Sequence, residues 1–175
     1  SLNAAMGAIN TKSLDDLKTV AQCEQTLDDM QEALTEYLIK VDNLSLSESQ
    51  KKHVNNLFNM VTDIERVGDH ADNLSENAKY MIDNNLEFSD LAKEDLAEIA
   101  KDAIDAFETA INASGANALG AVRKVNKLED KVDMLEDELR EKHIDRLTKG
   151  ECKPQSGIAF LDIISNLERV SDHAT

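Results

Sequence analysis

The residues of this chain with the clearest capacity for chemistry are four acidic pairs, each with the spacing Glu-x-x-x-Asp. They are Glu24 and Asp28, Glu65 and Asp69, Glu129 and Asp133, and Glu168 and Asp172. On a helix, residues four apart lie on one face, one turn from each other. Two carboxylates held so close repel unless a cation lies between them. The first and third pairs are 105 residues apart and the second and fourth 103, so the pattern predicts two metal sites.

The side chains of these pairs also indicate which ions would bind. Ligation by oxygen alone favours Mg²⁺, Ca²⁺, Mn²⁺ or ferric iron. A ferritin-like di-iron site requires Glu-x-x-His, and none of the four histidines has a glutamate three residues before it. His70 and His173 each follow the aspartate of a pair, about 100° further around the helix. We therefore interpret these two histidines as helix-packing groups rather than ligands.

The composition predicts an all-α domain with an aliphatic core. The chain has 175 residues, 41% of them hydrophobic, only 3% aromatic and a single proline. Its formal net charge of -16 argues against binding to nucleic acid. Cys23 and Cys152 form no Cys-x-x-Cys pair, so a thiolate zinc site or disulfide framework is not expected, which suits a reducing cytosol. No signal peptide and no apolar run long enough to span a bilayer is evident.

Hydrophobic periodicity predicts five long helices. They cover about 14–41, about 45–84, a stretch from 89 to a break near 114–115, a stretch ending at Gly150, and a stretch from Pro154 to the end. Ser13 and the Ser45-to-Glu48 capping box mark the first two starts, and Gly120 falls near the expected break. We predict one domain over 1–175, with repeat one at about 13–113 and repeat two at about 117–175.

The predicted helices can bring the acidic pairs together. Each pair lies roughly 70–120° to the same side of its own apolar stripe. For two antiparallel helices, equal offsets in the same sense place both pairs on one flank of the hairpin. The heights of the two pairs along the first hairpin differ by only about 5 Å. Gly68, inside the second pair, is explained either by close helix approach or by simple tolerance.

Two segments of the sequence resemble the signature helix of the PhoU family. They are Asp63-Ile-Glu-Arg-Val-Gly-Asp-His-Ala-Asp-Asn73 and Asn166-Leu-Glu-Arg-Val-Ser-Asp-His-Ala174. The resemblance implies a PhoU-like fold of two repeated antiparallel three-helix bundles, the second here without its last helix. It also implies a multinuclear, carboxylate-ligated metal cluster of iron, manganese, magnesium or calcium. The resemblance further implies that Glu65, Asp69, Glu168 and Asp172 are metal ligands, together with Glu24, Asp28, Glu129 and Asp133 from the partner helices. Because the first segment has Asp63 where the second has Asn166, the second site is expected to hold fewer ions.

The region 128–150 and the Phe160-Leu-Asp-Ile-Ile164 segment are most similar to PhoU-like domains fused to bacterial sodium/phosphate cotransporters. The main interpretation is therefore a metal-binding regulatory domain, and not an enzyme, on the cytoplasmic side of an inner-membrane protein. Its partner would be the membrane transporter domain of the same polypeptide, preceding Ser1, or a phosphate transporter subunit.

Three other interpretations remain open at this stage. The chain could be a stand-alone PhoU regulator of a phosphate ABC transporter and its sensor kinase. It could be a metal-storage or redox bundle, or a coiled-coil spacer without any ion. The helix after Ser89 supplies a third stripe for the first hairpin, but the second hairpin has no such stripe after it. We therefore expect either that this third helix packs across both hairpins or that the chain forms a homodimer.

Overall fold

The computed structural model describes residues 1–113 and 118–175, which form six α-helices and no strand. The helices are α1 (Leu2–Thr11), α2 (Leu14–Asp42), α3 (Glu48–Asp83), α4 (Asp90–Ile111), α5 (Ala118–Thr148) and α6 (Pro154–Asp172). The predicted all-α class is confirmed, and α2 to α6 correspond to the five predicted helices. α1 was not predicted. No helix in this part of the chain has both the length and the apolar character needed to cross a bilayer.

Serine side chains begin three of the helices. Ser13, Ser47 and Ser89 each accept a hydrogen bond from the backbone N–H three residues on, which satisfies a donor that the first helical turn leaves free. The capping box predicted at Ser45 is wrong. The structure forms it at Ser47 with Gln50, because the chain stays extended through Ser47 before α3 begins.

The later helix boundaries follow the proline and glycine signals. Pro154 occupies the first turn of α6, where its missing N–H is tolerated. Gly150 adopts a left-handed conformation after α5, with φ of 71°. Part of the predicted break, at 114–115, lies outside the described residues, whereas Gly120 lies inside α5.

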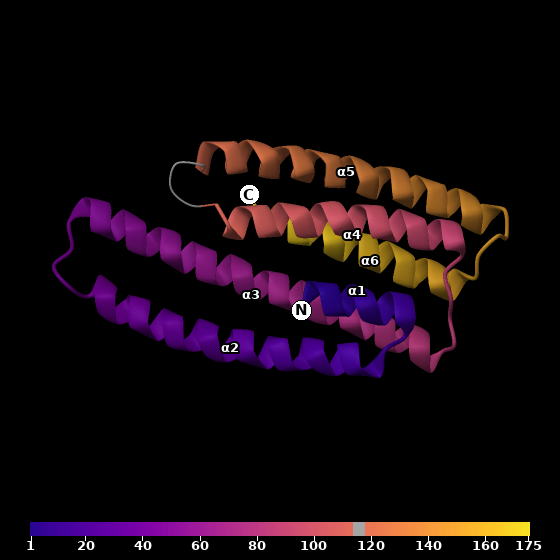
Figure 1. Cartoon of the computed structure of the whole chain (residues 1–175), viewed down its shortest axis with the longest axis horizontal. Helices are drawn as coiled ribbons and strands as arrows, with labels where there is room; N and C mark the ends of the chain where they lie inside the picture. Colours follow the sequence, from indigo (N-terminus) through magenta and orange to yellow (C-terminus); the bar gives the residue numbers. More distant parts are fainter. Residues whose placement is uncertain (114–117) are drawn as a thin grey trace.

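The helices assort into two groups that follow the chain order (Figure 1). α1 packs against α2 and α3, α4 packs against α5 and α6, and the two groups meet mainly through α3 and α6. The helix after Ser89 was expected to supply a stripe for the hairpin of α2 and α3 and to pack across both hairpins, unless the chain forms a homodimer. In the structure this helix, α4, covers the hairpin of α5 and α6, and α1 covers the hairpin of α2 and α3. The prediction of a helix shared by both hairpins is therefore wrong. The boundaries of the two sequence repeats, at 13–113 and 117–175, stay a prediction.

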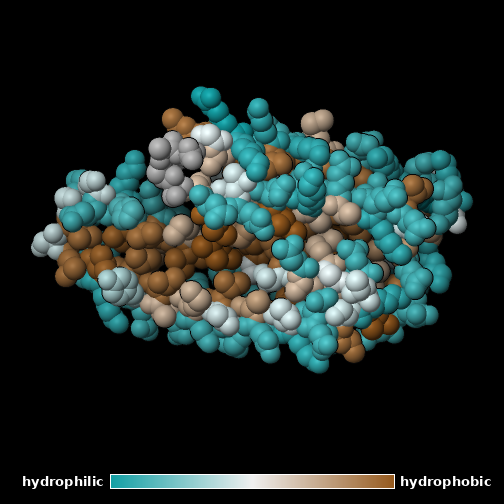
Figure 2. Space-filling view, viewed as in Figure 1, coloured by the Kyte–Doolittle hydropathy of each residue, from teal (hydrophilic) through white to brown (hydrophobic). Residues whose placement is uncertain are grey.

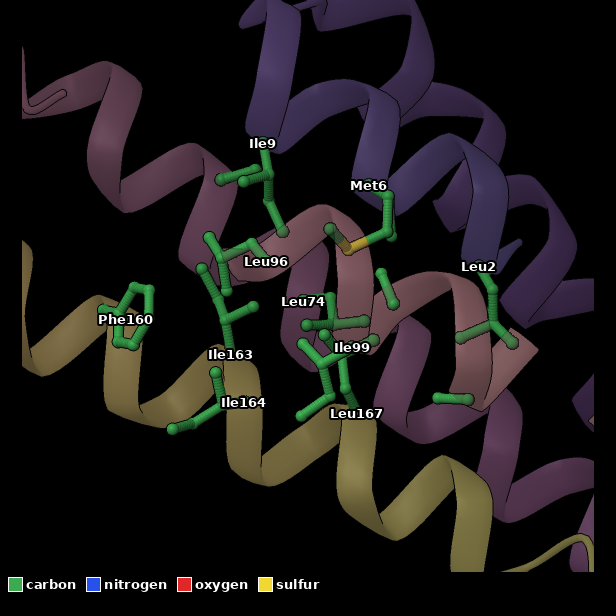
Figure 3. Close-up of a cluster of buried hydrophobic side chains, with 14 of the residues drawn as sticks. Leu2, Met6, Ile9, Leu74, Leu96, Ile99, Phe160, Ile163, Ile164 and Leu167 are labelled. Carbon is green, nitrogen blue, oxygen red and sulfur yellow. The ribbon is translucent and has the colours of Figure 1, made fainter. Parts of the chain in front are cut away.

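A single apolar core joins the two groups. Figure 3 shows side chains of α1, α3, α4 and α6 converging in it. Leu74, Leu96, Ile99, Ile163 and Leu167 are completely buried. These residues hold α3 and α6 in contact, and those two helices carry the segments that resemble the PhoU signature.

The end of the first hairpin has less cover than the rest. α1 has only 10 residues while α3 has 36, so α1 reaches along a fraction of the hairpin. Beyond it, Met30, Leu34 and Met60 are 54%, 43% and 51% exposed. Figure 2 shows a broad hydrophobic area on the side of the molecule where the α2–α3 turn lies.

Candidate metal centre

One acidic cluster lies between α5 and α6. Glu129 and Asp133 come from α5 and Asp172 from the last turn of α6, and one carboxylate oxygen of each lies within 4.8 Å of the others. In residues 1–113 and 118–175 this is the one set of three or more such side chains that meets this spacing. The structure therefore brings three of the eight predicted ligands within reach of a single ion.

Negative charge accumulates around this cluster, which is called the second cluster because it lies on the second helical hairpin. Burial raises the pKa of Glu168, and the nearby Asp172, Asp133 and Glu136 raise it further. The pKa values of Glu129 and Asp133 are raised for the same reasons, burial first and neighbouring carboxylates next. The ionised carboxylates are thus destabilised here, which is the electrostatic condition that a bound cation relieves.

Glu136 was missed in the sequence analysis. Its side chain is 11% exposed and pairs with Arg140. It lies three residues after Asp133, and that i,i+3 spacing was the available signal.

A looser acidic cluster occupies the equivalent place between α2 and α3. Burial raises the pKa of Glu24 to about 7, together with the negative charges of Asp28, Asp69 and Asp72. One oxygen of Glu24, Oε2, is buried and has no hydrogen-bond partner in the described part of the chain. Burial, then Asp69 and Asp28, raises the pKa of Glu65. Asp72, three residues after Asp69, was also missed in the sequence analysis.

Gly68 lets the two helices approach at the first cluster. A Cβ atom at this position would lie 2.6 Å from Leu27 Cδ1 and 3.1 Å from Glu24 Oε2, both on α2. Close helix approach, rather than tolerance, therefore explains the glycine. In the second hairpin, Val132 takes the position of Leu27 and Ser171 takes the position of Gly68. Valine is smaller than leucine, and both Val132 and Ser171 are completely buried.

The two clusters have a donor set suited to hard cations. Every group is a carboxylate, and one oxygen at the first cluster is buried without a partner. If an ion binds, Glu24, Asp28, Glu65 and Asp69 would hold it at the first cluster, and Glu129, Asp133, Glu168 and Asp172 at the second. Whether these eight residues are ligands stays a prediction, as does a multinuclear cluster.

His70 and His173 lie between α3 and α6 rather than in either cluster. Their rings stack with centroids 5.6 Å apart. His70 Nδ1 lies 2.9 Å from Asn166 Oδ1, and His173 Nδ1 lies 3.4 Å from Asp63 Oδ1. The two histidines are packing groups in this interface. Asp63 and Asn166 thus each contact one of these histidines, and the expectation that the second site holds fewer ions stays a prediction.

These features define a class of protein: an all-α double bundle whose two halves each carry an acidic cluster on the flank of a helical hairpin. The family profile of the PhoU domain matches residues 1–78 and 96–175, so the chain belongs to the PhoU family.

Two curated relatives and two solved structures agree with this assignment. The chain is 21% identical to the phosphate-specific transport system accessory protein PhoU homolog 1 of Thermotoga maritima, over 99% of this chain and 75% of that protein. It is 25% identical to the corresponding PhoU homolog of Clostridium acetobutylicum, over 90% of this chain and 80% of that protein.

The structural similarity covers almost the whole fold. The crystal structure of the phosphate transport system regulatory protein PhoU from Streptococcus pneumoniae has a TM-score of 0.81 at 19% identity, over 99% of this chain and 80% of that one. PhoU from Pseudomonas aeruginosa has a TM-score of 0.78 at 16% identity, over 99% and 82% of the two chains. At these identities the likeness shows the fold alone.

Proposed function

We propose that this chain is a metal-binding regulator of phosphate transport that acts by protein contact rather than by catalysis. Membership of the PhoU family is the observation that carries the proposal. The relatives from Thermotoga maritima and Clostridium acetobutylicum are named as accessory proteins of phosphate-specific transport systems. Those names support a stand-alone regulator of such a transporter over the sodium/phosphate cotransporter domain that the sequence suggested.

In this proposal the two acidic clusters bind Mg²⁺, Mn²⁺, Ca²⁺ or iron and hold the helical hairpins in one arrangement. A bound cation would neutralise carboxylates that otherwise repel across each hairpin. Because α3 and α6 carry clustered residues and also form the contact between the two bundles, metal binding would stiffen the surface presented to a partner. The partner would be a phosphate transporter subunit on the cytoplasmic face of the membrane.

The partly covered hairpin of α2 and α3 offers a second surface for protein contact. Met30, Leu34 and Met60 are exposed apolar side chains on facing helices, and such an area favours contact with a second copy or with the transporter. A homodimer is expected to show about twice the monomer mass by light scattering. Leu34→Glu should then return the mass to that of a monomer.

A genetic experiment tests the regulatory role. Deletion of the gene in its own organism should change phosphate uptake when phosphate is abundant, and expression of the intact protein should restore normal uptake. A variant with Asp69→Asn and Asp172→Asn should fold but fail to restore it, since one carboxylate of each cluster is lost. Unchanged uptake after deletion would count against the proposed function.

A further inference from the structure

A second polar site lies at the opposite end of α6 from the acidic cluster. A pocket of about 410 Å³ opens where the α3–α4 turn meets the α5–α6 turn, and Figure 1 shows these two turns at the same end of the molecule. Its walls include Asn85, His143, Arg146, Lys153 and Ser156. Ser156 and Asp172 lie at opposite ends of α6, about 24 Å apart along the helix. The pocket is therefore separate from the candidate metal centre.

His143 is the feature of this pocket that points to a ligand. Its side chain is 3% exposed, yet neither Nδ1 nor Nε2 has a hydrogen-bond partner among residues 1–113 and 118–175. The ring stacks on Phe160 at 4.7 Å between centroids. Glycine at position 157 leaves room for it, because a Cβ there would lie 2.7 Å from Nε2. A buried polar group without a partner costs about 1–3 kcal/mol, so a bound group that satisfies the imidazole would be favoured.

Two basic side chains, Arg146 and Lys153, line the pocket together with His143, in a chain that is otherwise strongly acidic. Arg146 donates from Nη1 to Asp95 at 2.8 Å, while its buried Nη2 has no partner in the described part of the chain. Lys153 precedes α6, and its side chain does not cap the helix. Free backbone N–H groups at a helix start attract anions. Glu87 and Glu151 also line the pocket, but Lys12 pairs with Glu87 at 3.0 Å.

The protonation state of His143 narrows the choice of anion. Burial, and then the charge of Arg146, lowers the pKa of His143, which favours the neutral ring. A neutral imidazole has one nitrogen that donates and one that accepts. Hydrogen phosphate offers both acceptor oxygens and an O–H donor, whereas sulfate offers acceptors alone. A phosphomonoester has a second pKa of about 6, so at neutral pH it has largely lost its O–H.

We propose that this pocket binds inorganic phosphate as hydrogen phosphate, with His143, Arg146, Lys153 and the start of α6 as its partners. The proposal depends on none of the acidic-cluster residues. It goes beyond the proposed function by assigning the chain a phosphate site of its own, and each can fail without the other.

Cys152 provides a direct test, because it lines the pocket while Cys23 lies on α2 in the other bundle. The rates at which iodoacetamide modifies the two thiols would be followed by mass spectrometry at pH 7.5, with added inorganic phosphate, sulfate or glycerol phosphate at equal ionic strength. Phosphate is expected to slow modification of Cys152 in a saturable way and to leave Cys23 unchanged. Equal protection by sulfate or by glycerol phosphate, or no protection by phosphate, would overturn the proposal.

Two lysine variants give the matched comparison. Lys153→Gln removes a charge from the pocket wall, whereas Lys149→Gln removes one from an exposed pair with Asp145 outside it. Lys153→Gln should weaken phosphate protection about tenfold, the loss expected for one charged hydrogen bond. Lys149→Gln should leave it unchanged. Since both side chains are exposed, both variants should fold, and equal behaviour of the two would contradict the assignment of the site.

Discussion

His70 and His173 stack across the α3–α6 interface with ring centroids 5.6 Å apart. Each ring also contacts the residue that lies seven positions before the other histidine: His70 contacts Asn166, and His173 contacts Asp63. The two signature-like helices therefore meet through a reciprocal set of contacts. The acidic clusters lie on other faces of the same helices, so each helix serves both an interface and a candidate site.

The reciprocal contacts predict that Asn166 stabilises the interface. Asn166 Oδ1 lies 2.9 Å from His70 Nδ1 and accepts a hydrogen bond from Asn73 Nδ2 at 3.3 Å. Asn166→Ala should lower the free energy of unfolding by about 1–2 kcal/mol, because it leaves the half-buried ring of His70 without this partner, whereas the exposed Asn73 can bond to water. Asn77→Ala is the control, since that side chain bonds only a carbonyl of its own helix. Urea denaturation of both variants measures the difference, and equal midpoints would contradict the role of Asn166.

The close approach at Gly68 predicts a destabilising alanine substitution. Gly68→Ala would place a methyl group 2.6 Å from Leu27 Cδ1. The overpacking costs about 1–3 kcal/mol, against a gain of up to about 1 kcal/mol in helix propensity. We expect a lower urea midpoint, and partial recovery when Leu27→Val is added to imitate Val132.

Gly120 provides the matched control for this substitution. It also lies inside a helix, but a Cβ there would meet nothing within 4 Å. Gly120→Ala should therefore raise the free energy of unfolding by about 0.5–1 kcal/mol. A loss of stability in both variants would show that the approach of α2 is not the cause at Gly68.

The raised pKa of Glu24 predicts how the stability of the metal-free protein depends on pH. Its pKa rises from 4.5 to about 7 on folding, so the folded protein holds a proton that the unfolded chain has already released. Stability therefore falls as the pH rises from about 4.5 to about 7, and this contribution is constant above that range. Thermal unfolding in the presence of a chelator should show the decline, and added Mg²⁺ or Mn²⁺ should reduce it.

Two glutamine variants isolate the effect of Glu24. Glu24→Gln removes the titrating group and should flatten the decline between about pH 4.5 and 7. Glu32→Gln removes an equal charge from an exposed position of the same helix and should leave the slope as it is. The interpretation is wrong if the two variants have the same pH profile.

The position of Asp172 in the second cluster predicts that its substitution weakens metal binding. It is one of the three carboxylates gathered at the second cluster, whereas Asp162 is an exposed carboxylate elsewhere on α6. Asp172→Asn should weaken Mn²⁺ binding at one site by at least about tenfold, and Asp162→Asn should not. Calorimetric titration with Mn²⁺ measures both. The same affinity in both variants would remove Asp172 from the ligand set.

Much of this protein could be predicted from its sequence because helices depend on local signals. The 3.6-residue periodicity, Ser13, Ser89, Pro154 and Gly150 predicted the positions of α2 to α6 closely. The same periodicity placed the acidic pairs on matching flanks, since i,i+4 spacing fixes the face of a helix on which a side chain lies. The gathering of Glu129, Asp133 and Asp172 follows from that register once the two helices are antiparallel.

The choice of packing partners was decided only by tertiary structure. α4 has an apolar stripe that either hairpin could bury, and nothing local specifies that it covers α5 and α6 rather than α2 and α3. α1 is short and its N-cap, Ser1, makes no side-chain cap hydrogen bond, so its existence depends on burying Met6 and Ile9 against the other helices. The inclusion of Asp72 and Glu136 in the acidic clusters, and the unpartnered nitrogens of His143, likewise depend on which helices lie side by side. Burial and the proximity of distant residues are properties of the packed chain, and the sequence order of those residues does not contain them.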